Sequence, residues 1–139
     1  MAYWLFKSEP NTWGWEQQKA KGAEGEQWDG VRNYQARNNM RAMKLGERGF
    51  FYHSVNEKRI VGIVEVSAEI HPDTTTDDPR WECVDIRAVA DMPRPVTLAE
   101  IKAEPRLADF ALVKQSRLSV VPVSEADWAL ICEMGEYRA

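Results

Sequence analysis

The sequence predicts an α+β domain, a small mixed β-barrel of five to six short strands with peripheral helices. Several runs of β-branched and aromatic residues have the length of strands, and amphipathic segments with helix-capping residues lie between them. The 139 residues, 44% of them hydrophobic, suit one compact domain over 1–139. No repeat, linker or low-complexity segment divides the sequence, so we expect a single core.

The first part of the chain predicts a strand and a short helix. Residues 3–8 alternate in size and polarity, which favours a strand. Thr12 is a suitable cap for a helix over 13–21, which Gly22 would stop.

A second helix is expected over residues 33–44. Its spacing puts small and flexible apolar residues on one side, namely Ala36, Met40 and Met43. The opposite side carries one aromatic residue with polar and cationic ones, namely Tyr34, Arg37, Asn38 and Arg41.

The middle of the chain is rich in strand-forming residues. Strands are predicted over residues 49–54, 60–70 and 81–90, with a Thr- and Asp-rich loop over 71–80. Because proline cannot donate a ladder hydrogen bond, Pro93 and Pro95 are expected to end the third of these strands.

Cap residues mark two helices in the last part of the chain. Thr97 and Glu100 form a capping box for a helix that ends before Pro105. A last strand over 118–123 leads to Ser124, which is expected to cap the terminal helix.

Charge and cysteine content restrict the possible functions. A net charge of −4 argues against a protein that coats nucleic acid through its phosphates, although it allows a local basic rim. Cys83 and Cys132 lack metal-ligand spacing and are expected to be reduced. The apolar run over 3–6 is too short for a signal peptide or a membrane span, so a cytoplasmic protein is expected, or a nuclear one in a eukaryote.

The segment over residues 28–39 carries the strongest functional signal. It combines Trp28 and Tyr34 with Arg32, Arg37 and several amides. Aromatic rings, guanidinium groups and planar amides are what proteins use to stack on a base and read its edge. The alternative interpretation is a surface helix, with Trp28 filling the core.

Four further places hold candidate site residues. Each also has a simpler structural interpretation: an ordinary turn, a hydrogen-bonded histidine, core packing or a surface ion pair. The candidates are Lys7, Ser8 and Glu9 after the first strand; Tyr52, His53 and Ser54 in the aromatic strand; Trp81 after the acidic loop; and Arg117 and Leu118 before the last strand.

Several common catalytic and cofactor motifs are missing from the sequence. It contains no phosphate-binding glycine loop, dinucleotide fingerprint, Cys/His metal cluster or nucleophile elbow. We therefore expect no cofactor and no metal, and Asp77-Asp78 is better interpreted as a solvated loop.

Five stretches, spread over nearly the whole chain, match the pattern of one known family. They are 4–10 (WLFKSEP), 28–38 (WDGVRNYQARN), 50–54 (FFYHS), 60–66 (IVGIVEV) and 116–120 (SRLSV). Through them the chain resembles the EVE domain family. Two features differ from most members of the family: the Trp13-Gly14-Trp15 run and a shortened loop over 72–80.

This resemblance implies a PUA-like fold, related to ASCH and YTH domains, and a module that reads a modified base in DNA or RNA. Trp28 would form one wall of an aromatic pocket for a flipped base, with Trp81 or Tyr52 opposite. The expected base-binding residues are Ser8, Glu9, Trp28, Asn33, Tyr34, Tyr52, His53, Ser54, Trp81 and Leu118. The expected phosphate or rim residues are Lys7, Arg32, Arg37 and Arg117.

The implied partner is nucleic acid carrying a modified base, such as a modified cytosine, or a free modified nucleotide, bound by a monomer. Two alternatives remain open. One is a small metal-independent hydrolase of modified nucleosides, as among ASCH relatives, with Lys7 acting beside Glu9 or Glu65. The other is a protein-interaction module that uses exposed tryptophans.

Overall fold

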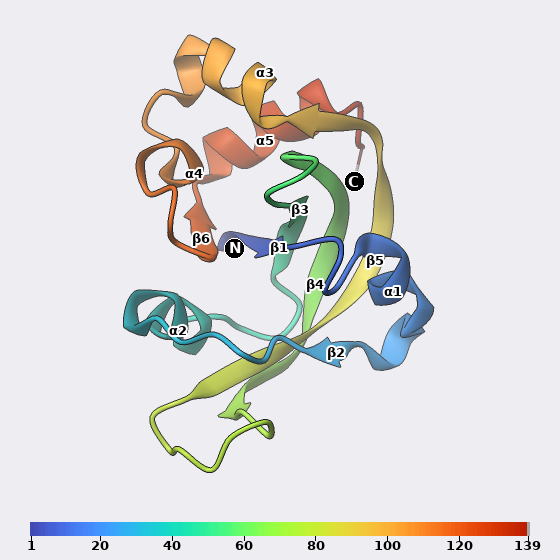
Figure 1. Ribbon diagram of the computed structural model, residues 1–139. Helices are drawn as coiled ribbons and strands as arrows, with labels where there is room; N and C mark the ends of the chain where they lie inside the picture. The colour runs from blue at the N-terminus through green and yellow to red at the C-terminus, as the bar shows by residue number, and fades with distance from the viewer. Residues whose placement is uncertain (139) are drawn as a thin grey trace.

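A single six-stranded mixed sheet organises the chain, as predicted (Figure 1). The computed structural model describes residues 1–138. The strand order is β2-β5-β4-β3-β1-β6; β1 and β3 are parallel and every other pair is antiparallel. The strands are β1 (Tyr3–Ser8), β2 (Glu26–Gln27), β3 (Arg48–His53), β4 (Arg59–Pro72), β5 (Glu82–Thr97) and β6 (Val120–Val123).

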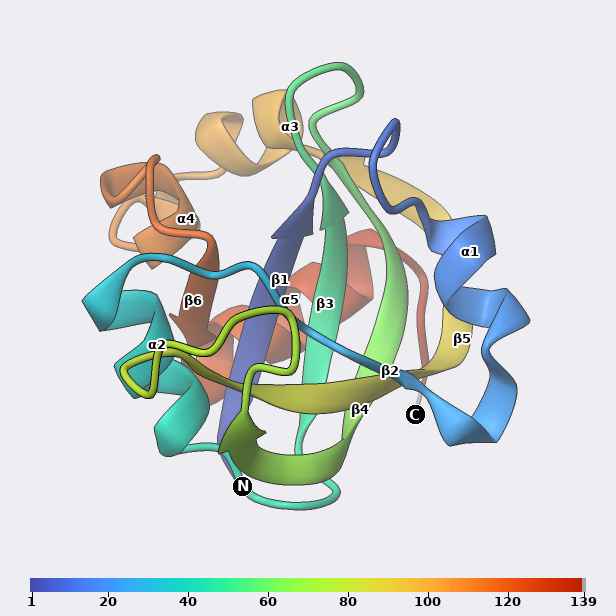
Figure 2. The same cartoon turned by 60° about the horizontal axis from the view of Figure 1, so that its bottom comes forward.

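Short helices surround this sheet, and Figure 2 shows α5 behind β1 and β3, with α1 and α2 on either side. The α-helices are α1 (Trp15–Ala20), α2 (Tyr34–Arg41), α3 (Leu98–Ala103), α4 (Ala111–Lys114) and α5 (Glu125–Met134), and two 3₁₀ turns are η1 (Gly22–Glu24) and η2 (Pro105–Leu107). Within residues 1–138, no helix is long and apolar enough to cross a membrane.

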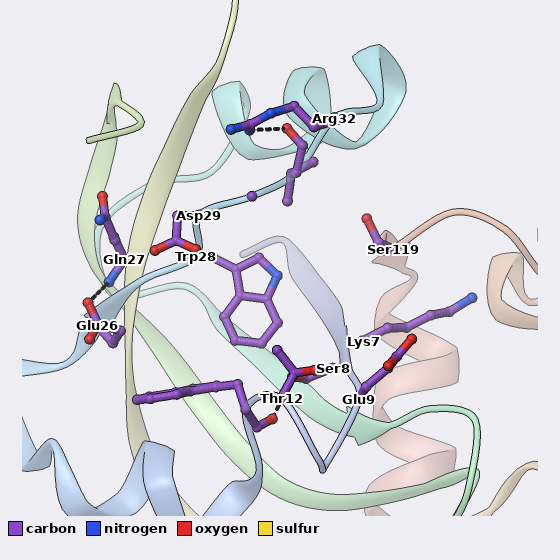
Figure 3. A pocket seen from close by; sticks show the side chains of 13 residues that line it. Lys7, Ser8, Glu9, Thr12, Glu26, Gln27, Trp28, Asp29, Arg32 and Ser119 are labelled. Carbon is purple, nitrogen blue, oxygen red and sulfur yellow. Dashed lines mark hydrogen bonds between the residues drawn. The ribbon is translucent and has the colours of Figure 1, made fainter. Parts of the chain in front are cut away.

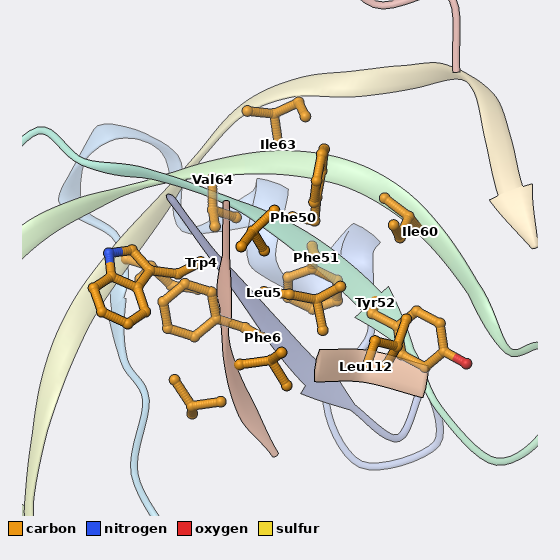
Figure 4. Close-up of a cluster of buried hydrophobic side chains, with 14 of the residues drawn as sticks. Trp4, Leu5, Phe6, Phe50, Phe51, Tyr52, Ile60, Ile63, Val64 and Leu112 are labelled. Carbon is orange, nitrogen blue, oxygen red and sulfur yellow. The ribbon is translucent and has the colours of Figure 1, made fainter. Parts of the chain in front are cut away.

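The central strand β3 is buried on both faces of the sheet. Successive strand residues point to opposite sides, so Phe50 and Phe51 meet different partners. Phe50 stacks on Trp128 of α5, with ring centroids 4.2 Å apart. Phe51 packs against Trp15 at 5.1 Å and Trp28 at 5.7 Å. The core therefore lies on both sides of the sheet, and Figure 4 shows part of it.

Three helices start where the sequence predicts, each at a capping residue. Asn33 caps α2, its Oδ1 accepting the Ala36 N–H at 2.9 Å. The capping box of Thr97 and Glu100 opens α3, and Ser124 caps α5. The predicted apolar side of α2 is also confirmed, since Ala36 and Met40 are fully buried.

Two helix boundaries differ from the prediction. Thr12 does not cap α1, because the N–H groups of Thr12 and Trp13 both donate to the Glu9 carbonyl and form a turn. The helix starts only at Trp15, after Gly14. Helix α2 ends at Arg41 rather than Lys44, because the Lys44 N–H is taken by the Glu47 carboxylate at 2.8 Å.

The expectation that Pro93 and Pro95 end a strand is wrong, since β5 continues to Thr97. The pairing of β4 with β5 shifts here: Ile60 faces Val96, whereas Gly62 faces Asp91. The extra residues of β5 form a bulge, in which both prolines are exposed. A bulge leaves residues without ladder partners, so the missing proline N–H groups cost no hydrogen bond.

Trp15 fixes α1 to the sheet. Its backbone N–H donates to Nε2 of His53 at 3.0 Å, and its indole Nε1–H donates to Asp91 at 2.7 Å. A Cβ atom at Gly62 would lie 2.2 Å from the Trp15 ring, so the ring packs directly on bare strand backbone.

Candidate functional site

A cavity of about 610 Å³ lies between the end of β1 and the segment over residues 26–32 (Figure 3). Two of the six tryptophans line it, together with charged groups of both signs. The lining residues are Lys7, Ser8, Glu9, Thr12, Trp13, Glu26, Gln27, Trp28, Asp29, Gly30, Val31, Arg32 and Ser119.

Trp28 belongs both to the core and to the cavity wall. Its side chain is 8% exposed and makes edge contacts with Phe6 at 5.4 Å and Phe51 at 5.7 Å. Among residues 1–138, its indole Nε1–H has no hydrogen-bond partner, and Figure 3 shows the ring in the middle of the cavity. The cavity therefore offers a rigid aromatic surface with one free donor.

The end of β1 supplies three polar groups to the cavity. The Lys7 Nζ donates to the Ser116 carbonyl at 2.9 Å, and partial burial lowers the pKa of this lysine. The Ser8 hydroxyl donates to the Trp13 carbonyl, which leaves its oxygen as an acceptor. Glu9 is exposed, so its carboxylate is open to a ligand.

Asp73 anchors the opposite wall from outside the cavity. Its side chain is 1% exposed and accepts hydrogen bonds from the Gly30 N–H at 2.9 Å, from Arg32 at 3.1 Å, and from the N–H and hydroxyl of Thr75. Burial alone would raise the pKa of this carboxyl, but these donors lower it to about 2. The charged form of Asp73 therefore holds residues 30–32 in place.

Asp29 carries a carboxylate that lines the cavity on this wall. Partial burial, together with the nearby charges of Asp73 and Glu26, raises its pKa above the ordinary aspartate value. With Glu9 across the cavity, it makes the site rich in hydrogen-bond acceptors.

An arginine–aromatic column stands beside the cavity, made of Tyr34, Trp81, Arg32, Arg37 and Arg80. Tyr34 and Trp81 stack with centroids 5.1 Å apart and planes at 27°. Arg37 lies 4.8 Å from the Tyr34 ring, while Arg32 and Arg80 lie 5.5 and 5.9 Å from the Trp81 ring. Arg32 belongs to both features, since it also lines the cavity.

The order of these features along the chain matches a known family. The family model of the EVE domain matches residues 2–134. The chain belongs to the EVE domain family.

Solved structures of similar proteins have the same fold. A protein from Agrobacterium tumefaciens is 59% identical, with a TM-score of 0.97 over 99% of this chain and 94% of that one. Human thymocyte nuclear protein 1 is 35% identical over 97% of this chain and 74% of its own length. Its crystal structure in complex with 5-methylcytosine-containing DNA is 34% identical and covers 100% of both chains, with a TM-score of 0.90.

The expected relation to YTH domains is confirmed at the level of the fold. The YTH domain of the MRB1 protein of Zygosaccharomyces rouxii, solved with N6-methyladenosine RNA, has a TM-score of 0.56 over 99% of this chain and 88% of that one. Its sequence is only 16% identical, so the likeness concerns the α+β fold alone.

Five of the predicted site residues line the cavity of this EVE domain: Lys7, Ser8, Glu9, Trp28 and Arg32. Tyr34, Trp81 and Arg37 form the column instead. Arg117 is exposed outside the cavity lining.

The other predicted pocket residues have structural positions. Asn33 uses its Oδ1 to cap α2, and the Ser54 N–H extends the pairing of β3 with β1 by donating to the Ser8 carbonyl at 2.8 Å. Leu118 is a core residue, 4% exposed.

Tyr52 and His53 lie away from the cavity because β3 is covered on both faces. Tyr52 is 3% exposed, on the same side of the strand as Phe50, and burial raises its pKa to about 12 (Figure 4). His53 is 8% exposed, and its two ring nitrogens face the Trp15 N–H and the Glu57 carboxylate. His53 therefore matches the structural interpretation of the sequence, in which it is a hydrogen-bonded histidine.

Sequence reasoning missed several lining residues, among them Thr12, Trp13, Gln27, Asp29 and Ser119. Three of them had a usable signal. Gln27 and Asp29 flank Trp28, and Trp13 belongs to the Trp-Gly-Trp run that distinguishes this chain from most of its family.

His71 is expected to make the stability of the protein depend on pH. Its Nδ1 faces the Pro72 carbonyl at 2.8 Å and its Nε2 faces Asp85 at 2.7 Å, so both nitrogens donate only in the protonated ring. Burial alone would lower its pKa, but these two acceptors raise it. The stabilisation is complete below the unfolded pKa of about 6.5 and is lost as the pH rises through the higher folded pKa.

Melting temperatures of the wild type and of His71→Gln, measured from about pH 6 to about pH 9, check this expectation. The stability of the wild type relative to the variant should fall as the pH rises. The change should be about 1 kcal/mol or less, because His71 and Asp85 are both partly exposed. Parallel curves across this range would contradict the assigned protonation.

Proposed function

We propose that this EVE domain binds a modified nucleobase, such as a modified cytosine in DNA or RNA, and holds it flipped out of its strand. The observation that carries the proposal is the cavity with Trp28 in its wall. Support also comes from human thymocyte nuclear protein 1, which is similar over the full length of this chain and whose structure holds 5-methylcytosine-containing DNA. We propose that the same kind of ligand enters the cavity here.

The size and wall of the cavity suit one planar heterocycle. A volume of about 610 Å³ lies within the range of about 300–1,000 Å³ found for small-molecule sites. Flipping a base costs a few kcal/mol of stacking, and an aromatic surface returns about 1–3 kcal/mol per base. Trp28 is one such surface, and Trp13 is the second tryptophan that lines the cavity.

The polar groups match the edge of a cytosine. Its exocyclic amino group is a donor, which a carboxylate such as Asp29 or Glu9 would accept. Its ring nitrogen and carbonyl are acceptors, for which the Trp28 Nε1–H is an available donor. Val31 gives apolar contact for a methyl group.

Binding to two matched oligonucleotides, identical except for one methyl group on a central cytosine, tests the proposal by calorimetry. The methylated strand is expected to bind more tightly. Asp29→Ala should weaken that binding by about 1–3 kcal/mol, because the base amino group loses its acceptor.

Asp109→Ala is the matched control. Asp109 is also an exposed aspartate, but it lies outside the cavity lining and pairs with Lys114 at 2.9 Å. Equal affinity for the two strands, or equal losses in the two variants, would count against the proposed site.

One observation favours a hydrolase as second candidate. Burial lowers the pKa of Lys7, which increases its neutral, nucleophilic fraction, and Glu9 shares the cavity with it. Glu65 is not a partner, since it pairs with Arg48 and Arg87. Chromatography after incubation with acylated and alkylated nucleosides tests this reaction. Product formed by the wild type and not by Lys7→Ala would establish that the protein hydrolyses modified nucleosides and is not a base-binding module.

A further inference from the structure

We infer that the arginine–aromatic column binds a backbone phosphate next to the flipped base, so that the protein holds the strand at a second place outside the cavity. This inference rests on the proposed function and adds a backbone contact to that site. It concerns a surface outside the cavity, with Arg37 as the main contact.

The column holds its guanidinium groups in fixed orientations. Arg37 lies over the Tyr34 ring at 4.8 Å, and it also donates to the Arg80 carbonyl at 2.9 Å and to Asn38 at 3.0 Å. Arg80 in turn donates to the Tyr34 hydroxyl at 3.3 Å. A stacked guanidinium is already held in one orientation, so it loses little further conformational freedom when it binds a ligand. Its planar fork of N–H donors also matches the oxygens of a phosphate.

The charges of the column leave one cation uncompensated. Arg32 pairs with Asp73 and Arg80 pairs with Asp78. Among residues 1–138, Arg37 forms no ion pair, and its hydrogen bonds go only to neutral oxygens. In a protein with a net charge of −4, an unpaired, rigid arginine beside a cavity is a specific place for an anion.

The position of the column connects it to the cavity. Arg32 lines the cavity and lies 5.5 Å from the Trp81 ring, so the two features share one side chain. Figure 2 shows the loop after β4 lying against α2. The stacking of Trp81 on Tyr34 and the hydrogen bond from Arg37 to the Arg80 carbonyl join these two segments. Tyr34 is 50% exposed, so the column is open to a strand whose base enters the cavity.

The test compares two probes: 5-methyl-2′-deoxycytidine, which has no phosphate, and a single-stranded oligonucleotide containing it. Arg37→Gln is expected to weaken oligonucleotide binding by about tenfold and leave nucleoside binding unchanged. The slope of log affinity against log salt should fall by about 0.7, the value for one lost phosphate contact on a single strand. Arg37→Lys keeps the charge and should restore the slope.

Arg106→Gln is the matched control, because it removes the same charge from the distant turn η2. A salt slope unchanged by Arg37→Gln, or equal losses for nucleoside and oligonucleotide, would overturn the inference. The unmodified oligonucleotide separates this result from the proposed function. If methylation makes no difference but Arg37→Gln still lowers the slope, the base-reading proposal fails and the phosphate contact stands.

Discussion

Trp28→Ala is expected to abolish binding of the methylated oligonucleotide and to lower the free energy of unfolding by about 3–5 kcal/mol. Both effects follow from the position of the ring. Its edge contacts with Phe6 and Phe51 make it part of the core, while its indole N–H and one surface face the cavity. The sequence alone suggests a loss of binding without unfolding; the core contacts predict that stability falls as well.

Trp128→Ala separates these two effects. Trp128 is also 8% exposed, but it stacks on Phe50 and Tyr3 on the other side of the sheet. Its truncation should lower the melting temperature by a similar amount, whereas affinity measured well below that temperature should be kept. Trp28→Phe refills most of the core and still lacks the N–H, so it should bind weakly. Normal affinity in both Trp28 variants would show that the ring is not part of the binding site.

Local sequence signals predict the elements of this fold well, because their causes are local. Asn33, Thr97 and Ser124 cap helices through hydrogen bonds that span three residues. The apolar side of α2 follows from helical spacing in the same way. The fold class was predictable because five strand-like runs with short connections leave few alternatives.

The cavity was less predictable because it is assembled by contacts between distant segments. Asp73 reaches Gly30 and Arg32, more than forty residues away. The turn that brings Thr12 and Trp13 to the cavity depends on the Glu9 carbonyl rather than on a residue pattern. Tyr52 and His53 looked accessible in an aromatic strand, but helices on both faces of the sheet bury them. Side-chain chemistry identified Trp28, whereas only tertiary packing reveals what it faces.

Asp73→Ala is expected to lower the free energy of unfolding by about 3 kcal/mol at neutral pH and to weaken oligonucleotide binding. The buried carboxylate accepts from Gly30, Arg32 and Thr75, and its loss leaves these donors without a partner. Residues 30–32 would then no longer be fixed as a cavity wall. Asp78→Ala is the control: the Asp78 carboxylate pairs with Arg80 at the surface, so its removal should change stability little.

The pH dependence of the stability difference between the wild type and Asp73→Ala tests whether the charge of Asp73 is the cause. The pKa of Asp73 is about 2 in the folded protein, below its unfolded value of about 3.9. Its contribution is therefore complete above about pH 4 and is lost as the pH falls toward 2, which corresponds to about 2–3 kcal/mol. Urea midpoints of the wild type and Asp73→Ala should converge as the pH is lowered over this interval. A constant difference would mean that Asp73 stabilises the wall by its shape and not by its charge, and the acceptor role assigned to it here would have to be abandoned.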